Sequence, residues 1–476
     1  MNTIKIETLG CRLNQIESEA AGRFFLDKGF HVDMSSTTAT SVENTEVCLA
    51  ILNTCTVTQK AEQKARRIIR LMLKKYPQAA VLVTGCYAQL SKEEILKIDQ
   101  RICVIGGQIK SRIEEVPVLL QSCLNDSWSA DTFAKKVQSE ITDKIVVKPG
   151  FPEQAFKLSA SSFVAHSRAS LKIQDGCNSN CSYCAIHMAR GHSVSLDVQT
   201  AIDRVKELEA LGHSEVVLTT VNIGQYKGVW KDGYCNFTGL LKLLLENTST
   251  ISFRISSLYP EVVDDEFCKV IADKRVRPHF HISVQSGSDA VLKNMNRVYK
   301  SKAVLDACNK IKAVKNNPFL ACDIITGFPG ETAEDFEQTM DLCKKCNFSW
   351  IHAFPFSERP RTVAATLKNK VPQSVSGERA KQITEWAINQ KITYIEQWCG
   401  VELEAILETC KRPVAMSGGA ANQIYIYHLM TENFIHCEIQ SPKMLELNKQ
   451  VKIKIIKPLP DRITKGGEIE ALAQFI

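Results

Sequence analysis

The chain has 476 residues, of which 44% are hydrophobic and 23% are charged, and its formal net charge is +7. This length predicts about two to four domains, and the composition excludes wholesale disorder, while the mild positive charge is compatible with a polyanionic partner. No window reaches roughly 18 consecutive apolar residues, and the N-terminal stretch MNTIKIETLGCRLNQ lacks a signal-peptide core, so we expect a cytoplasmic protein with no membrane partner.

Residues 1–125 alternate short apolar runs with helical segments, which predicts an α/β domain with a parallel sheet. The expected strands are TIKIETLGC, EVCLAILNTC and AAVLVTGC, and each runs directly into a cysteine, namely Cys11, Cys55 and Cys86. Because ligand sites of open parallel sheets lie beyond the carboxyl ends of the strands, these thiols can converge in space. Three unrelated buried thiols are the alternative. Cys48 lies inside its strand and is expected to belong to the core.

The rest of the chain divides into three further parts. Residues 126–165 lack sustained periodicity and are expected to form a linker. Residues 166–395 resume the alternation with six strand–helix units, which predict a partial parallel barrel of the (β/α)6 type. Its expected strands are ASLKIQ, EVVLTTV, ISFRISS, HFHISVQ, FLACDIITGF and WIHAFPF. Residues 397–476 are β-rich runs separated by turns, which predict a small all-β module.

One segment with closely spaced cysteines follows the first expected barrel strand. DGCNSNCSYCAIHMARG places Cys177, Cys181 and Cys184 in a C-x3-C-x2-C spacing, in a chain with eighteen cysteines. Three thiolates can hold three irons of a [4Fe–4S] cube and leave the fourth iron open to a ligand. Structural zinc is the competing interpretation, although zinc normally takes four protein ligands from two C-x-x-C pairs.

This motif, with Tyr183 just before its last cysteine, resembles that of the radical S-adenosylmethionine (SAM) enzymes. TLGCRLNQIESE, LNTCTVTQKAEQKARRIIR and VLVTGCYAQL are similar to the N-terminal domain of the methylthiotransferases within that superfamily. HISVQSGSDAVLKNMNRVY, DIITGFPGETAEDFEQT and FPFSERPRT are similar to the barrel motifs of the same family. The C-terminal module resembles the family's RNA-binding TRAM domain more weakly.

The resemblance implies two [4Fe–4S] clusters, one on the C-x3-C-x2-C motif and a second on Cys11, Cys55 and Cys86. SAM would bind the open iron of the first cluster and yield a 5′-deoxyadenosyl radical, while the second cluster carries or supplies sulfur. One SAM molecule would methylate this sulfur, and another would generate the radical that removes hydrogen from C2 of a purine. An electron donor such as flavodoxin or ferredoxin and a source of sulfur are also implied.

NTCTVT, the K-x-R-x-x-I-R run and LGCRLNQ resemble the branch of the family that acts on N6-threonylcarbamoyladenosine beside the anticodon of tRNA. The isopentenyladenosine branch usually carries NTCSVR after its second cysteine, and a third branch modifies an aspartate of a ribosomal protein. Both remain alternatives. A more distant alternative is a non-catalytic RNA-binding protein whose clusters are structural or sense the redox state.

Several residues are candidates for contacts with SAM. Asn222, Gln285 and Ser286 follow or end barrel strands and can form hydrogen bonds to its polar groups, and we expect Tyr183 to lie beside it. Arg190 can bind a carboxylate of SAM or of the substrate with two parallel hydrogen bonds.

Basic side chains predict contacts with RNA phosphates at two places. Lys64 and Arg67 lie on the helix that follows Cys55, and Lys452 and Lys454 lie on a strand of the C-terminal module. A solvated helix face is the alternative for the first pair. One segment departs from the family pattern, because SERPRT has Glu358 and Arg361 where relatives commonly have a basic residue and then a glycine.

Overall fold

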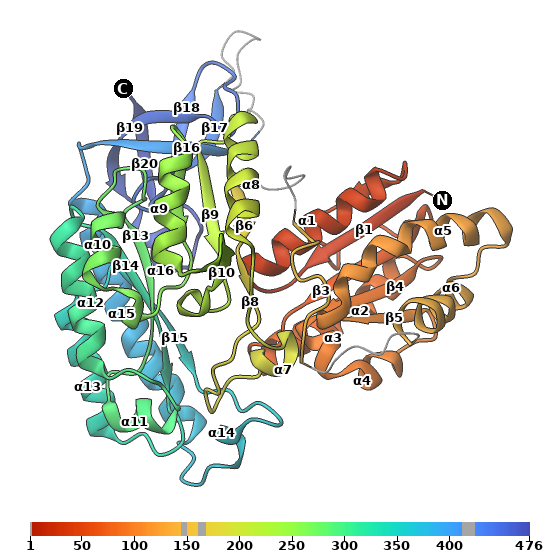
Figure 1. Ribbon diagram of the computed structural model, residues 1–476, viewed down its shortest axis with the longest axis horizontal. Helices are drawn as coiled ribbons and strands as arrows, with labels where there is room; N and C mark the ends of the chain where they lie inside the picture. The colour runs from red at the N-terminus through yellow and green to blue at the C-terminus, as the bar shows by residue number, and fades with distance from the viewer. Residues whose placement is uncertain (1, 144–149, 160–167, 412–423) are drawn as a thin grey trace.

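The computed structural model describes residues 2–143, 150–159, 168–411 and 424–476. It contains an N-terminal α/β domain, a central partial barrel and a small C-terminal β-barrel (Figure 1). The N-terminal domain lies to one side of the central barrel, and the C-terminal barrel covers one end of it (Figure 1). In this described part of the chain, no helix combines the length and the apolar character needed to cross a membrane. The expected α/β fold class with its three parts is confirmed.

The N-terminal domain is built on a parallel sheet with the strand order β2-β1-β3-β4-β5. Its strands are β1 (Thr3–Thr8), β2 (His31–Asp33), β3 (Val47–Thr54), β4 (Ala80–Gly85) and β5 (Ile102–Gly106). Every residue of β3 and β4 is buried, as expected for parallel strands that are covered on both faces. Cys48 is fully buried in β3, so its assignment to the core is confirmed.

Helices cover both faces of this sheet. On one face lie α1 (Arg12–Leu26), α5 (Val116–Asp126) and α6 (Ala130–Lys136). On the other lie α2 (Gln59–Lys75), α3 (Cys86–Leu90) and α4 (Lys92–Leu96). A 3₁₀ segment, η1 (Gly107–Glu115), connects β5 to α5. Thr58 caps α2 by accepting a hydrogen bond from the Ala61 amide at 3.1 Å, which fixes where the helix begins, shortly after Cys55.

The expected linker, residues 126–165, is folded where the structure describes it, and residues 144–149 and 160–165 lie outside the described part of the chain. α6 and a π-helical turn, η2 (Val137–Thr142), continue the N-terminal domain, and Phe133 and Val137 belong to its hydrophobic core. Residues 150–159 also lie against this domain, since the Glu153 amide donates to the Gln108 carbonyl at 2.7 Å. Elements this short do not produce a periodic pattern long enough to recognise, which is why the sequence suggested a linker there.

The central barrel has the six parallel strands that were expected. They are β6 (Ala169–Lys172), β9 (Glu215–Thr219), β12 (Ser252–Ile255), β13 (His279–Gln285), β14 (Phe319–Thr326) and β15 (Trp350–Pro355). They form two sheets with the orders β12-β9-β6 and β13-β14-β15, and isolated parallel bridges such as Leu258 to Ile282 join the two. The edges of the partial barrel are therefore β6 and β15, and α1 of the N-terminal domain packs beside β6.

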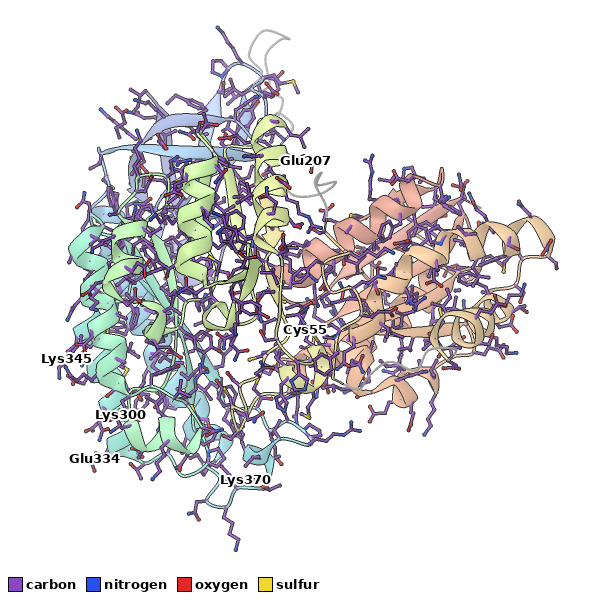
Figure 2. The ribbon with its side chains drawn as sticks, viewed as in Figure 1. Cys55, Glu207, Lys300, Glu334, Lys345 and Lys370 are labelled. Carbon is purple, nitrogen blue, oxygen red and sulfur yellow. The ribbon has the colours of Figure 1, made fainter. Side chains whose placement is uncertain are left out.

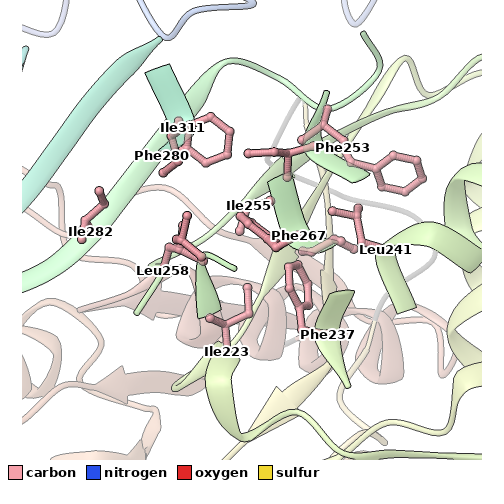
Figure 3. Close-up of a cluster of buried hydrophobic side chains, with 14 of the residues drawn as sticks. Ile223, Phe237, Leu241, Phe253, Ile255, Leu258, Phe267, Phe280, Ile282 and Ile311 are labelled. Carbon is pink, nitrogen blue, oxygen red and sulfur yellow. The ribbon is translucent and has the colours of Figure 1, made fainter. Parts of the chain in front are cut away.

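Helices follow the barrel strands, and the longer ones cover the outer side of the barrel. They are α7 (Ile186–Arg190), α8 (Val198–Ala210), α9 (Phe237–Asn247), α10 (Asp265–Ile271), α11 (Asp289–Asn294), α12 (Ser301–Val314), α13 (Ala333–Cys346), α14 (Val363–Thr366) and α15 (Gln373–Glu396). Alternate strand residues such as Phe253 and Ile282 pack with helix residues such as Phe267 in one core (Figure 3). Short hairpins pair β7 (Gln174–Asp175) with β8 (Val194–Ser195) and β10 (Gly228–Trp230) with β11 (Gly233–Cys235).

The C-terminal module is a closed barrel with the order β16-β17-β18-β20-β19. Its elements are β16 (Glu402–Lys411), β17 (Tyr425–Thr431), β18 (His436–Ser441), β19 (Gln450–Pro458), α16 (Pro460–Thr464) and β20 (Ala471–Phe475). It docks where the central strands begin, because Arg168 precedes β6 and pairs with Glu408 at 2.6 Å, and Arg277 precedes β13 and pairs with Glu404 at 2.8 Å. The C-x3-C-x2-C loop lies at the opposite end of these strands.

Candidate iron–sulfur and SAM site

Cys11, Cys55 and Cys86 come after three neighbouring strands of the N-terminal sheet. Thr54 at the end of β3 pairs with Gly85 at the end of β4, so the cysteines that follow them start from adjacent positions. β1 pairs with β3 on its other side. Burial raises the pKa of the Cys55 thiol to about 12, and the neighbouring thiols of Cys86 and Cys11 add to this rise. The three side chains are therefore close enough to interact electrostatically.

Glycines before two of these cysteines allow the strand ends to approach one another. A Cβ atom on Gly10 would lie 2.5 Å from the Cβ of Cys55, and one on Gly85 would lie 2.4 Å from the carbonyl oxygen of Thr54. Both glycines also have positive φ angles, +113° and +92°. No other residue adopts this backbone without strain, so the glycines let three thiols gather around one space.

Asn14 of α1 joins two of the strand ends. Its side-chain amide donates to the carbonyl of Leu9 at 2.9 Å and to the carbonyl of Thr54 at 3.0 Å. Its carbonyl oxygen lies 4.0 Å from the sulfur of Cys11. Asn14 thus holds the turn of Cys11 against the turn of Cys55.

The second group of cysteines lies in the loop between β7 and α7. Each sulfur has a hydrogen-bond donor: the Ser179 amide at 3.4 Å from Cys177, Arg297 at 3.3 Å from Cys181, and the Ile186 amide at 3.4 Å from Cys184. Burial raises the pKa of the Cys184 thiol to about 12, and Cys181 and Cys177 add to the rise. Donors aimed at sulfur stabilise thiolates that bind iron and tune the potential of an iron–sulfur cluster.

The base of this loop is fixed by Gln174 and Gly176. Gln174 is fully buried, accepts hydrogen bonds from the amides of Val221 and Asn222 at 2.9 and 3.0 Å, and donates to the Gly176 carbonyl at 2.7 Å. A Cβ atom on Gly176 would lie 2.0 Å from the carbonyl oxygen of His192. The loop is therefore closed tightly at its base and tied to the end of β9.

Helices that adjoin the two cysteine groups meet at the interface between the N-terminal domain and the barrel. Helix α7, which follows Cys184, packs against α3, which begins at Cys86. The Gln108 side chain donates to the carbonyl of Met188 in α7 at 3.1 Å. Figure 2 labels Cys55 where the two parts of the molecule meet. Two cysteine segments that are distant in sequence thus lie beside a shared interface.

The SERPRT segment also docks at this interface. Arg359 forms a buried ion pair with Glu62 of α2 and a hydrogen bond to Thr56, the residue after Cys55. Glu358, one of the two departures expected from the family pattern, pairs with Lys370 at 2.7 Å. Arg361, the other expected departure, has a φ of +68°, a backbone conformation that favours glycine.

The expected SAM contacts have different surroundings. Tyr183 is half-buried and packs beside Phe328 of the loop after β14. Asn222 holds the cysteine loop through Ser179 at 3.3 Å, and Gln285 has a φ of +69° at the end of β13, a strained conformation typical of functional sites. Ser286 requires a correction, because it is 1% exposed and bonds within the protein, so its hydroxyl is not free to contact SAM.

Arg190 also requires a correction. The sequence suggested a bond to a carboxylate of SAM or the substrate, but its guanidinium is buried and is bound by Asp175 at 2.8 Å and by Glu17 at 3.2 Å. It also donates to the side-chain amide oxygen of Asn14 at 2.7 Å. The carboxylates that it binds belong to this chain.

The basic candidates differ in their pairing. Lys64 and Arg67 are exposed on one face of α2. Lys452 is exposed and pairs with Glu402 of β16 at 2.7 Å, and Lys454 is half-buried opposite the same glutamate in the strand register. The C-terminal lysines are therefore partly neutralised, whereas the lysine and arginine of α2 remain open to solvent.

The donor set fits an iron–sulfur cluster better than a single metal ion. Across the described ranges, no group of three or more His, Cys, Asp or Glu side chains is arranged to hold one ion. A [4Fe–4S] cube places each thiolate on a different iron, so its three sulfurs do not meet at one point. Structural zinc normally takes four protein ligands around a single centre, whereas each of these two groups offers three thiols.

Sequence reasoning missed four residues that shape these sites, namely Asn14, Glu17, Gln174 and Arg297. Asn14, Glu17 and Arg297 lie inside motifs quoted above for the family resemblance, and Gln174 ends the first expected barrel strand. The structure buries Asn14, Glu17 and Gln174, and half-buried Arg297 donates to the Cys181 sulfur. Buried polar groups need partners, but the sequence alone does not say which residues are buried.

Comparisons with known proteins find relatives that match most of this chain. A family model described as the Radical SAM superfamily matches residues 171–343, and one described as uncharacterized protein family UPF0004 matches residues 3–107. The chain is 43% identical over 449 residues to the threonylcarbamoyladenosine tRNA methylthiotransferase MtaB of Treponema pallidum, which covers 86% of this chain and 91% of that protein. It is 32% identical over 452 residues to the MtaB protein of Thermotoga maritima, covering 94% and 96%.

Solved structures show the same fold at low identity. The radical S-adenosylmethionine methyltransferase TsrM from Kitasatospora setae, solved with cobalamin and a [4Fe–4S] cluster, matches with a TM-score of 0.50 and 13% identity. The match covers 76% of this chain and 77% of that chain. At this identity the likeness concerns the arrangement of the chain.

Proposed function

The chain belongs to the family of threonylcarbamoyladenosine tRNA methylthiotransferases, and we propose that it adds a methylthio group to C2 of N6-threonylcarbamoyladenosine beside the anticodon of tRNA. Membership of the radical SAM superfamily implies one [4Fe–4S] cluster and SAM. The observation that carries the rest of the proposal is the pair of three-cysteine sites that lie beside one interface. A second cluster on Cys11, Cys55 and Cys86 is part of the proposal.

When bound, the clusters and SAM supply the radical, the methyl group and the sulfur. The protein contributes position and shielding. Cys177, Cys181 and Cys184 would hold the first cluster, and the amides of Ser179 and Ile186 orient the outer two sulfurs. Because hydrogen abstraction needs no general base, no acid–base pair is assigned.

In the proposed second site, Cys55 and Cys86 are buried while Cys11 is exposed. Cys55 and Cys86 are therefore shielded from water at the ends of β3 and β4. The substrate would approach from the side of Cys11. Asn14 and the glycines before Cys11 and Cys86 keep the three thiols at a fixed spacing, so that the site exists before the cluster binds.

We assign RNA contacts first to helix α2. Its exposed residues are Gln59, Lys60, Gln63, Lys64, Arg67, Arg70 and Lys74, and none of these is acidic. The helix begins four residues after Cys55, so phosphates bound along it would lie near the proposed second site. Lys452 and Lys454 would add weaker contacts, because glutamates of β16 face them.

Two partners complete the proposal. Reductive cleavage of SAM needs a one-electron donor of low potential, such as flavodoxin or ferredoxin. Each turnover consumes one sulfur atom, so a sulfur source must restore the second site.

The test compares tRNA nucleosides by mass spectrometry in cells that have or lack the gene. We expect the 2-methylthio derivative of N6-threonylcarbamoyladenosine to disappear without the gene and to return with wild-type protein. Cys11→Ala and Cys181→Ala should each fail to restore it, whereas Cys410→Ala on β16 should restore it fully. Loss of methylthio-isopentenyladenosine, or of a modified ribosomal aspartate, would instead identify one of the other branches.

A further inference from the structure

Five charged side chains form a buried network between the two cysteine sites. Glu17 of α1 and Lys110 of η1 come from the N-terminal domain, and Lys172 of β6, Asp175 of β7 and Arg190 of α7 come from the barrel. All five side chains are at most 8% exposed. Because the network crosses the interface, it holds the N-terminal domain in one position on the barrel.

Its contacts are close and shared. Lys172 lies 3.0 Å from Glu17 and 3.1 Å from Asp175. Arg190 lies 3.2 Å from Glu17 and 2.8 Å from Asp175, and Lys110 forms a further ion pair with Glu17. Burial raises the pKa of Glu17, but Arg190, Lys110 and Lys172 outweigh burial and lower this pKa to about 2. The carboxylate is therefore ionised at neutral pH.

The network is not neutral. Three cations and two anions have formal charges that sum to +1, and a surplus charge away from water is costly unless an opposite charge lies nearby. The neighbouring groups are the cysteines of the proposed second site. Arg190 donates to the side-chain carbonyl oxygen of Asn14 at 2.7 Å, and this oxygen lies 4.0 Å from the sulfur of Cys11. A [4Fe–4S] cluster on three thiolates carries net negative charge, so it would balance the surplus.

We propose that this network is a positioning and charge-balancing device for the second cluster, and that Arg190 raises the reduction potential of that cluster. The proposal rests on the proposed function, because it requires a cluster on Cys11, Cys55 and Cys86. One electron added to the cluster makes its charge more negative by one. A fixed positive charge beside it therefore stabilises the reduced form over the oxidised form.

The experiment measures the midpoint potential of the second cluster alone. Full-length protein with Cys177, Cys181 and Cys184 all changed to alanine is reconstituted with iron and sulfide and titrated under EPR detection. We expect Arg190→Gln to lower the potential so that the ratio of reduced to oxidised cluster falls at least tenfold, which is about 59 mV for one electron. Glu17→Gln should raise the potential, because it removes a negative charge from the same network.

Both variants remove ion pairs across the interface, so a purely structural effect would shift the potential in the same direction in both. Shifts in opposite directions therefore indicate an electrostatic role. Arg190→Lys should keep the potential near that of the parent protein. Glu17→Gln combined with Arg190→Gln leaves the network charge at +1, so it should also return the potential toward the parent value. Lys345→Gln on the far side of the barrel (Figure 2) changes the charge equally and should shift nothing.

Shifts of the same sign in Arg190→Gln and Glu17→Gln, or no shift in either, would overturn the proposal while leaving the second cluster in place. If the single variants lose iron, the iron content of the double variant distinguishes the two roles. A purely structural role predicts that the double variant loses even more iron, whereas charge balance predicts that its iron content recovers. A parent protein that binds no iron at Cys11, Cys55 and Cys86 would refute this proposal and the second cluster together.

Discussion

Gly85→Ala is the sharpest test of how the N-terminal sheet builds its cysteine site. Gly85 ends β4 with φ +92° and ψ −161°, a region that is essentially restricted to glycine. A Cβ atom there would lie 2.4 Å from the carbonyl oxygen and 2.7 Å from the amide nitrogen of Thr54. Both are backbone atoms of the neighbouring strand, so a flexible side chain cannot move aside to relieve the clash.

The expected cost has two parts. Holding alanine in this backbone region costs about 1–3 kcal/mol, and the overpacking against β3 adds about 1–3 kcal/mol. The free energy of unfolding should therefore fall by about 2–6 kcal/mol. Because the clash pushes Cys86 away from Cys55, the second cluster should also be lost, and iron per chain should fall from about eight to about four if two [4Fe–4S] clusters are bound.

The assay combines urea denaturation with iron and sulfide analysis of reconstituted protein. Gly29→Ala is the matched control, since Gly29 has a φ of +82° but no atom within 4 Å of an added Cβ. It should show the backbone strain of about 1–2 kcal/mol without the clash, and it should keep all its iron. If the two variants lose equal stability, or if Gly85→Ala keeps its full iron content, the account of how the cysteines converge is wrong.

Three further predictions follow from charged residues. Lowering the pKa of Glu17 from 4.5 to about 2 adds about 3 kcal/mol to folding stability above pH 4.5, and this stability is lost as the pH falls toward 2. Urea denaturation between pH 7 and pH 3 should therefore show that the free energies of unfolding of wild type and Glu17→Gln differ less as the pH falls. A difference that stays constant over this range would contradict the linkage. Arg297→Met removes the donor to the Cys181 sulfur, so 5′-deoxyadenosine formation with dithionite should slow at least tenfold with the iron content unchanged; an unchanged rate would exclude this role. In the wild-type chain Glu215 lies 2.8 Å from buried Arg254, so Glu215→Gln leaves that arginine without its full charge partner. Thermal unfolding should show a loss of about 3–5 kcal/mol of stability. Lys345→Gln breaks an exposed ion pair and should change stability by less than about 1 kcal/mol.

The elements that the sequence predicted are those with continuous or alternating apolar patterns. β3 and the six barrel strands have such patterns, since their buried residues pack against covering helices. β2 has only three residues and is not fully buried, and β20 follows a turn near the chain end. Neither has a pattern strong enough to recognise. The convergence of Cys11, Cys55 and Cys86 could be predicted because the carboxyl ends of neighbouring parallel strands meet at one edge.

The partners of polar residues could not be predicted. Arg190 is 173 positions from Glu17, and nothing local in either segment indicates that the two meet. From the sequence alone we expected Arg190 to bind a carboxylate of a ligand, because guanidinium groups often bind carboxylates. The tertiary fold supplied carboxylates from the protein itself. Such pairings depend on how two domains dock, and a single sequence carries no direct record of docking.

The position of the C-terminal barrel limits what that module can do. It is attached where the central strands begin, and the cysteine loop follows where they end. β13 has seven residues, so the two ends are separated by about 20 Å at 3.3 Å per residue. A bound RNA that reached both would touch the C-terminal lysines with nucleotides well away from the base under attack. Contacts between that module and RNA would therefore bear on how the whole RNA is held and not on the position of the reacting base.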